Sequence, residues 1–252
     1  MGPEAVTRLA GLLGRRWRQD PAGGSGSRPG SRPAFYALET GGWRDYVTLL
    51  HPPYTAWHLS YVAIGAALAP ELHSERLLAA LAAFFLALGI GAHALDELQG
   101  RPLRTEIPTG VLWGLALGSI AGAVVIGVVS ALLWTPWLLV FVAAGAFLVF
   151  AYNLEFFGGA FHTDLWFALA WGAFPLLTGY FVVAERLSLE ALIAAIFAVA
   201  ASLAQRILST QVRAVRRGRI AESGDIAPAE NALRALTLSI VALAAALLAL
   251  RW

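Results

Sequence analysis

The stretch LLAALAAFFLALGIGAHALDELQGRP (Leu77–Pro102) decides the fold, because a long apolar run ends there in one imidazole and two carboxylates. On a helix, His93, Asp96 and Glu97 are three and four residues apart and share one face. Ionisable groups at the margin of a membrane helix are costly to hold, so three on one face indicate a site. The simpler interpretation is that they mark where the helix leaves the lipid.

The composition of the chain indicates an integral membrane protein. Hydrophobic residues make up 58% of it and charged residues 13%, against roughly 25% charged in soluble domains. Cysteine and lysine are both absent, which excludes disulfides, thiolate metal sites and lysine chemistry. Apolar runs predict an all-α bundle of about seven transmembrane helices, at about 54–70, 75–98, 108–130, 131–151, 164–184, 188–212 and 229–250.

The arginines predict the topology of this bundle. Of the 18 basic residues, 15 precede the first predicted helix, follow the second or lie around the loop between the sixth and seventh. Arg76, Arg186 and Arg251 lie on the other side. The positive-inside rule therefore predicts a multi-pass protein whose N-terminus and second, fourth and sixth loops are cytoplasmic. The pI near 9.3 follows from this topology, and we expect no nucleic-acid partner.

The chain divides into three parts. Residues 1–19 are basic and amphipathic and predict an arm that lies on membrane lipids. Residues 20–34 are rich in glycine, serine and proline and predict a flexible linker. Residues 35–252 form the predicted transmembrane domain.

Three polar clusters fall on the predicted cytoplasmic side, where they would form a cap of loops over an apolar cavity. The first is His93, Asp96 and Glu97 with Arg101 and Arg104; the second is the loop from Tyr152 and Asn153 to His162 and Asp164; the third is the stripe Gln205, Arg206, Ser209, Arg213, Arg216 and Arg217. Carboxylates that face an arginine stripe suit a phosphate or diphosphate bound with Mg²⁺.

Each cluster has an alternative interpretation. The arginine stripe is also typical of positive-inside anchoring on anionic lipid. Gly158-Gly159 is typical of a turn, and His162 and Asp164 of a helix start. His51, His58, His93 and His162 with the nearby carboxylates could also form an iron or zinc site. Most of the aromatic residues near this side are explained by an interfacial belt and helix packing.

The order of motifs resembles the UbiA-type superfamily of membrane prenyltransferases over about residues 50 to 250. Members start their first helix with Arg-Pro-x-x-Trp, where this chain has His51-Pro52-Pro53-Tyr54-Thr55-Ala56-Trp57. Their second helix ends in Asn-Asp-x-x-Asp, which aligns with His93-Ala94-Leu95-Asp96-Glu97, and Pro108-Thr109-Gly110 is similar to their Pro-Ser-Gly turn. Tyr152 matches a loop tyrosine, and Gly172-Ala173-Phe174-Pro175-Leu176-Leu177-Thr178-Gly179 resembles their Gly-x-x-Pro-Leu-x-Gly pattern.

The resemblance implies a membrane enzyme that acts on a polyprenyl diphosphate with Mg²⁺ and transfers the prenyl group to a lipophilic acceptor. Asp96, Glu97 and His93 would hold the metal, and His58 or His162 would take a proton. Diphosphate oxygens would bind Arg101, Arg206, Arg213, Arg216 and Asn153. The prenyl chain would lie against Trp57, Tyr61, Trp166 and Trp171.

Two departures from the family leave other functions open. The chain lacks the second acidic motif, since Gln205–Arg217 contains no acid, and it has about seven predicted helices where the family usually has nine. Arginines could neutralise the diphosphate directly in place of the metals that the missing acids would hold. The alternatives are a membrane terpene cyclase, which needs no acceptor, and a non-catalytic protein that binds isoprenoids or lipids.

Overall fold

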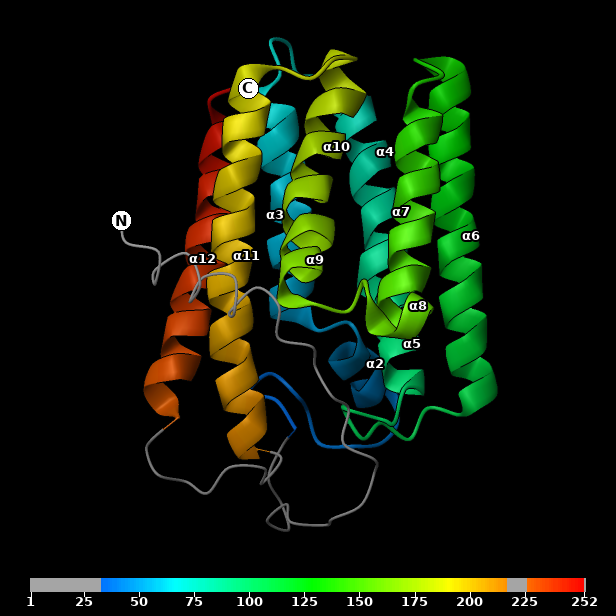
Figure 1. The fold of residues 1–252 in the computed structure, drawn as a ribbon, viewed down its shortest axis with the longest axis vertical. Helices are drawn as coiled ribbons and strands as arrows, with labels where there is room; N and C mark the ends of the chain where they lie inside the picture. The colour runs from blue at the N-terminus through cyan, green and yellow to red at the C-terminus, as the bar shows by residue number, and fades with distance from the viewer. Residues whose placement is uncertain (1–32, 217–225, 252) are drawn as a thin grey trace.

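The computed structural model describes residues 33–216 and 226–251, and this part of the chain is all helical and loop, without strands. The long helices stand side by side with nearly parallel axes (Figure 1). The elements in order are α2 (Trp43–Leu49), α3 (Pro52–Leu68), α4 (Ser74–Phe84), η1 (Phe85–Ala92), α5 (His93–Leu98), α6 (Thr109–Leu133), α7 (Leu138–Asn153), α8 (Phe156–Gly159), α9 (Asp164–Ala168), η2 (Leu169–Ala173), α10 (Phe174–Ala184), α11 (Leu189–Arg216) and α12 (Ala227–Ala249).

A helix lies at each of the seven predicted ranges, and within the described residues five helical segments are long and apolar enough to cross a membrane. These are Ser74–Leu98, Thr109–Leu133, Asp164–Ala184, Leu189–Arg216 and Ala227–Ala249. The helix α7 is apolar but has only 16 residues, and α3 has 17. The predicted start of α7 at residue 131 is wrong, because α6 continues to Leu133 and a turn containing Pro136 follows.

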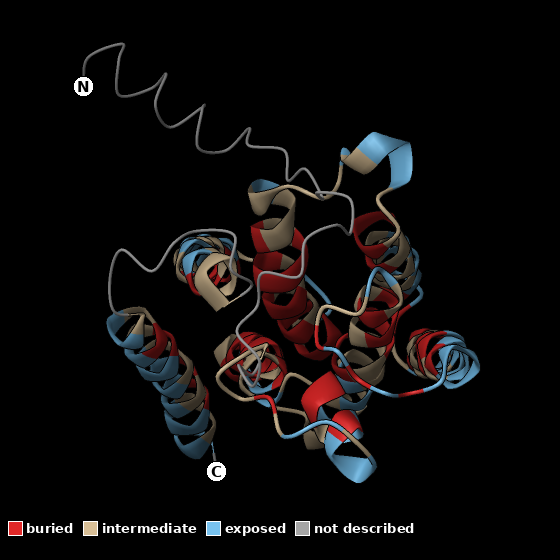
Figure 2. Ribbon diagram, turned by 90° about the horizontal axis from the view of Figure 1, so that it is seen from below, coloured by how far each residue is buried: buried red, intermediate tan, exposed pale blue. Residues whose placement is uncertain are grey.

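The surface of the bundle is apolar where a soluble protein would be polar. Large side chains such as Leu132, Val125, Ile196 and Leu238 are exposed on the outward faces of α6, α11 and α12. Buried residues gather on the sides of the helices that face one another (Figure 2). A continuous apolar exterior of this kind needs lipid around it. The structure thus supports a multi-pass integral membrane protein.

The centre of the bundle is a close crossing of α3 and α10. A Cβ on Gly65 would lie 2.0 Å from the carbonyl oxygen of Leu176, and one on Gly179 would lie 2.2 Å from that of Val62. Only glycine allows two helix backbones to approach so closely, and small residues are the usual means of helix packing in membranes. This crossing positions α3 as the central element, with α12 packed on its other side.

The two ends of the bundle differ in how they use arginine. At the end where α3 stops, Arg76 donates to backbone carbonyls that end α10 and forms a 2.7 Å ion pair with Glu185. Arg251 donates to the carbonyls that end α3. Both side chains therefore satisfy helix C-termini. The opposite end, where α3 starts and α5, α7 and α11 stop, is called the polar end below; α2, α5 and α8 lie there (Figure 1).

Buried carboxylates hold a loop over the polar end. Both oxygens of Glu97 accept hydrogen bonds from loop 99–108: from the N–H groups of Leu103 and Thr105, each at 2.9 Å, and from the Thr105 hydroxyl at 2.8 Å. Asp45 accepts from the N–H of Glu106 at 2.8 Å, which ties residues 38–49 to the same loop. Hydrogen bonds to the carboxylates of Glu97 and Asp45 therefore hold the cap of loops in place.

Residues 1–32, 217–225 and 252 are outside the described part of the chain. The predicted amphipathic arm and nearly all of the linker fall there. So do Arg217 and Arg219 of the loop after α11.

Candidate functional site

Several of the polar residues that the sequence singles out meet at the polar end, where α3, α5, α7, α9 and α11 contribute side chains. Two π-helical segments border this region: η1 leads directly into His93, and η2 contains Trp171. The carbonyl of Gly89 in η1 accepts from His93 Nδ1 at 3.1 Å, and that of Trp171 in η2 accepts from His58 Nδ1 at 2.8 Å. Short π segments inside α-helices are frequent at functional sites, and here each orients a histidine.

His51 and His93 form a stacked pair. Their ring centroids are 4.1 Å apart and their planes differ by 9°. His51 caps α3 in the left-handed region, with a φ of 46°, and its Nδ1 lies 2.8 Å from the hydroxyl oxygen of Tyr36. Burial, followed by the nearby His93, Arg213 and His58, lowers the pKa of His51 well below its ordinary value of 6.5. The ring is therefore neutral at pH 7.

Arg206 is the buried cation of the site. Its side chain is 8% exposed, its Nε donates to Asp164 at 3.1 Å, and its guanidinium lies 4.9 Å from the ring centroid of Phe167. The half-buried carboxylate of Asp96 and the hydroxyl of Tyr152 are near enough to act on it electrostatically. A buried charge needs such partners to offset its desolvation.

Arg213 lies about two helical turns further along α11 and is half-buried. Its charge acts on His51, Tyr54 and Tyr152. Three buried polar atoms around this region have no hydrogen-bond partner among the described residues: His51 Nε2, Tyr152 Oη and Gln205 Oε1. Buried polar atoms are normally paired, so these three indicate the place of a ligand.

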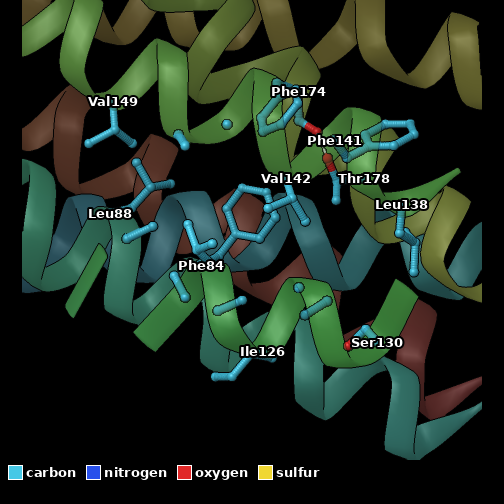
Figure 3. Close-up of a pocket in the computed structure, with 18 of the residues that line it drawn as sticks. Phe84, Leu88, Ile126, Ser130, Leu138, Phe141, Val142, Val149, Phe174 and Thr178 are labelled. Carbon is cyan, nitrogen blue, oxygen red and sulfur yellow. Dashed lines mark hydrogen bonds between the residues drawn. The ribbon is translucent and has the colours of Figure 1, made fainter. Parts of the chain in front are cut away.

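An apolar cavity of about 110 Å³ lies between α4, α6, α7 and α10. Its walls include Phe84, Leu88, Phe141, Val149, Trp171 and Phe174. The rings of Phe84 and Phe141 lie near that of Phe174, with centroids 6.0 and 6.2 Å apart, and the hydroxyl of Thr178 donates to the Phe174 carbonyl at 2.7 Å (Figure 3). The cavity is several times larger than one water molecule needs but offers it few polar partners.

Trp171 borders both the cavity and the polar cluster. Its ring lines the cavity and makes an edge contact with Tyr152, with centroids 5.4 Å apart. Its backbone carbonyl accepts from His58. The polar cluster and the cavity therefore adjoin at this residue, as expected for a polar cap of loops over an apolar cavity.

The predicted metal ligands do not meet. No group of three His, Cys, Asp or Glu residues within the described ranges could hold a metal ion. Glu97 is fully buried, and loop 99–108 occupies its carboxylate. His93 is stacked on His51, and Asp96 alone remains open to the cluster. The residues present therefore do not fit the predicted magnesium site, nor the alternative iron or zinc site, because adjacent residues on α5 point to different partners.

Two of the predicted diphosphate ligands have other partners. The guanidinium of Arg101 donates to the carbonyls of Thr105 and Ile107 inside the cap loop. Arg216 forms an ion pair with Glu230 that joins α11 to α12, with its Nε 2.6 Å from the carboxylate. We assign both side chains structural roles. Arg206 and Arg213 are the predicted arginines that remain at the polar cluster.

Of the predicted prenyl-lining residues, Trp171 lies at the cavity and three do not. Trp57 and Tyr61 face the opposite side of α3, and the Tyr61 hydroxyl contacts the Ala198 carbonyl and Ser202 on α11 at 3.2 Å. Trp166 packs on Phe161 with ring centroids 4.6 Å apart. The aromatic walls are formed instead by phenylalanines that the sequence alone did not single out.

The remaining predicted residues have backbone partners near the cluster. His162 donates through Nδ1 to the Tyr152 carbonyl at 3.0 Å and stacks on the Tyr152 ring. Asn153 donates to the Val149 carbonyl one turn earlier in α7. Thr163 is the N-cap of α9, since its hydroxyl accepts from the N–H of Trp166 at 3.2 Å.

Sequence reasoning missed the importance of His51 and Gln205 as unpartnered groups. His51 stood in the motif at the start of α3, but only its spatial neighbours give it a role.

Comparisons with family models, curated proteins and solved structures gave no match for this chain.

Proposed function

We propose that the protein is a membrane enzyme that binds a polyprenyl diphosphate and transfers its prenyl group to a lipophilic acceptor. The observation that carries the proposal is the position of Trp171 between a buried arginine-containing cluster and an aromatic-walled apolar cavity. A ligand with an anionic head group and an unsaturated hydrocarbon tail would match both the arginine-containing cluster and the apolar cavity. The motif order of the UbiA-type prenyltransferases, including the tyrosine at position 152, supports the same ligand class.

In this proposal the diphosphate binds at Arg213. Arg206 is buried against Asp164, so it contributes mainly a buried positive field. Arg213 is half-buried, and its charge acts on His51 and Tyr152, which both carry a buried polar atom without a hydrogen-bond partner among the described residues. A guanidinium can hold phosphate oxygens bidentately, and the Tyr152 hydroxyl can donate to a third oxygen. Hydrogen-bond donors that stabilise the leaving group promote cleavage of the bond to the prenyl carbon.

The cavity would hold the prenyl chain. Phe84, Phe141, Phe174 and Trp171 present ring faces or edges in its walls. Aromatic faces attract cations, so the same walls suit the allylic cation that forms when diphosphate leaves.

Arginine takes the place of magnesium in this mechanism. The predicted trio of ligands does not meet, and we assign no step to Mg²⁺. Binding of the diphosphate should therefore persist in EDTA. The positive-inside rule, applied to Arg44, Arg104 and Arg213 at the polar end, supports a cytoplasmic orientation for this end.

Binding of geranylgeranyl thiodiphosphate, an uncleavable analogue, to protein in lipid nanodiscs tests the proposal. Arg213→Gln should weaken binding at least tenfold, because it removes the phosphate contact, while Arg186→Gln at the far end should not. Ala146→Phe fills the cavity and should also weaken binding. Ala143→Phe, on the exposed face of the same helix, is its control. If neither Arg213→Gln nor Ala146→Phe weakened binding of the analogue, the proposed site would be refuted.

A second candidate function is isoprenoid binding without catalysis. It is favoured by the engagement of Glu97 and Asp164 in structural contacts, which leaves few groups for chemistry. Release of diphosphate from geranylgeranyl diphosphate separates the candidates. A binder releases none, a terpene cyclase releases it without an acceptor, and a transferase needs the acceptor.

A further inference from the structure

His51 differs from the other histidines of the polar end. His58, His93 and His162 each direct Nδ1 to a backbone carbonyl, which can only accept a hydrogen bond. His51 Nδ1 meets the hydroxyl of Tyr36, which can donate or accept. Its Nε2 is buried and has no partner in residues 33–216 and 226–251. The ring is held in place at Nδ1, whereas Nε2 is left without a hydrogen-bond partner among those residues.

The groups that face His51 come from four elements. Tyr36 lies before α2, Tyr54 and His58 are on α3, His93 starts α5, and Arg213 is on α11. The stack on His93 and the Tyr36 contact prevent the ring from turning. A fixed ring with a free nitrogen is suited to receive one defined ligand atom.

A diphosphate cannot satisfy every unpartnered atom of this cluster. Its ionised oxygens only accept hydrogen bonds, so they can pair with Arg213 and the Tyr152 hydroxyl. The side chain of Gln205 is hydrogen-bonded to Tyr54, but its Oε1 is buried without a partner among the described residues and can only accept from a donor. A buried amide oxygen that lacks a donor destabilises the site. A second ligand that carries a donor is therefore needed to complete the site.

We infer that His51 Nε2 is the proton acceptor for a hydroxylated lipophilic acceptor, a phenol or alcohol, that binds beside the diphosphate. This inference rests on the proposed function, and it implies prenyl transfer to an acceptor rather than cyclisation of the prenyl chain. In the His51 tautomer that can accept a proton, Nδ1–H donates to the Tyr36 hydroxyl and Nε2 carries the lone pair. The acceptor hydroxyl donates to Nε2, and Gln205 Oε1 faces the same ligand.

The transfer step balances with these groups. The bond between the prenyl C1 and the diphosphate oxygen breaks, and its electron pair leaves with the diphosphate at Arg213. The acceptor oxygen forms the new bond to C1 and releases its proton to His51 Nε2. The products are a prenyl ether, diphosphate and an imidazolium that still donates to Tyr36. The nearby diphosphate offsets the repulsion between this imidazolium and Arg213.

A matched pair of probes tests the subsite without turnover. Nanodisc-embedded protein that holds geranylgeranyl thiodiphosphate should bind 4-nonylphenol at least tenfold more tightly than nonylbenzene, which lacks only the hydroxyl. His51→Leu should remove this preference. Gln205→Met, of similar shape, should reduce it and serves if His51→Leu does not fold. His73→Leu, an exposed histidine near the far end, should leave the preference unchanged.

Turnover provides the second test. With geranylgeranyl diphosphate and 4-nonylphenol, His51→Gln should slow formation of the prenyl ether by about 10²–10⁴-fold, while binding of the thiodiphosphate stays within twofold. His73→Gln is again the control. Loss of thiodiphosphate binding in the wild type would refute the proposed function and this inference with it. Intact binding with no hydroxyl preference, or with full turnover in His51→Gln, would overturn only the inference.

Discussion

Replacement of Glu97 by glutamine should destabilise the whole polar end, although the change adds or removes no heavy atom. Glu97 is fully buried, and its oxygens accept from two backbone N–H groups and one hydroxyl of loop 99–108. Glutamine has one oxygen, so its NH₂ group must face an N–H that donates. Leu103 or Thr105 then keeps a buried N–H without an acceptor.

The size of the effect follows from these contacts. A hydrogen bond to a charged group contributes about 1.5–3 kcal/mol, and a buried group left unpaired costs about 1–3 kcal/mol. Because these two values describe overlapping parts of one loss, we expect about 2–3 kcal/mol for Glu97→Gln. In a chain of this length, that loss lowers the melting temperature by roughly 4–12 °C. Glu97→Ala, which removes all three bonds, should lose more.

Thermal unfolding in one detergent, followed by circular dichroism, measures this loss. The matched control is Asp96→Asn, which removes the neighbouring half-buried charge from the same helix and frees no loop N–H. Its melting temperature should lie within about 2 °C of the wild type. Equal melting temperatures for Glu97→Gln, Asp96→Asn and the wild type would show that the loop does not depend on this carboxylate, and the structural role assigned here would be wrong.

Three further outcomes are expected from the same thermal assay. Gly179→Ala should destabilise the protein strongly, because its Cβ would lie 2.2 Å from a backbone oxygen of α3, while Gly118→Ala has open space and should not; similar losses would refute the close crossing. Arg216→Ala and Glu230→Ala should not be additive, with a coupling of about 1 kcal/mol for their half-buried ion pair; additive losses would mean that the pair adds nothing. The lowered pKa of His51 means that the unfolded chain binds the proton more readily, so stability is full above pH 6.5 and falls toward pH 5. His51→Gln should flatten that fall, and an unchanged pH dependence would contradict it.

The sequence determined the class of the protein and the place of its polar residues. A chain this apolar must bury its helices in lipid, and short connections make successive helices antiparallel, so the polar ends of the second, fourth and sixth predicted helices meet at one end. The alternating direction of successive helices is sufficient to predict this, without any knowledge of how the helices pack. For that reason His93, Tyr152, His162, Arg206 and Arg213 could be assigned to one region before their contacts were known.

Only the tertiary structure decided what each of these residues does. Asp96 and Glu97 are neighbours on one helix, but about 100° of rotation separates successive side chains, so one faces the cluster and the other holds a loop. Helical periodicity defines a face of a helix but does not identify the element that packs on it, so the sequence could not show that Trp57 packs toward α11 and α12. The cavity walls come from α4, α6, α7 and α10, whose lining residues are spread from Ala79 to Val182. The position of His51 depends on its own left-handed backbone conformation and on its contacts with Tyr36 and His93. Tyr36 and His93 are distant in sequence, so no local pattern predicts these contacts.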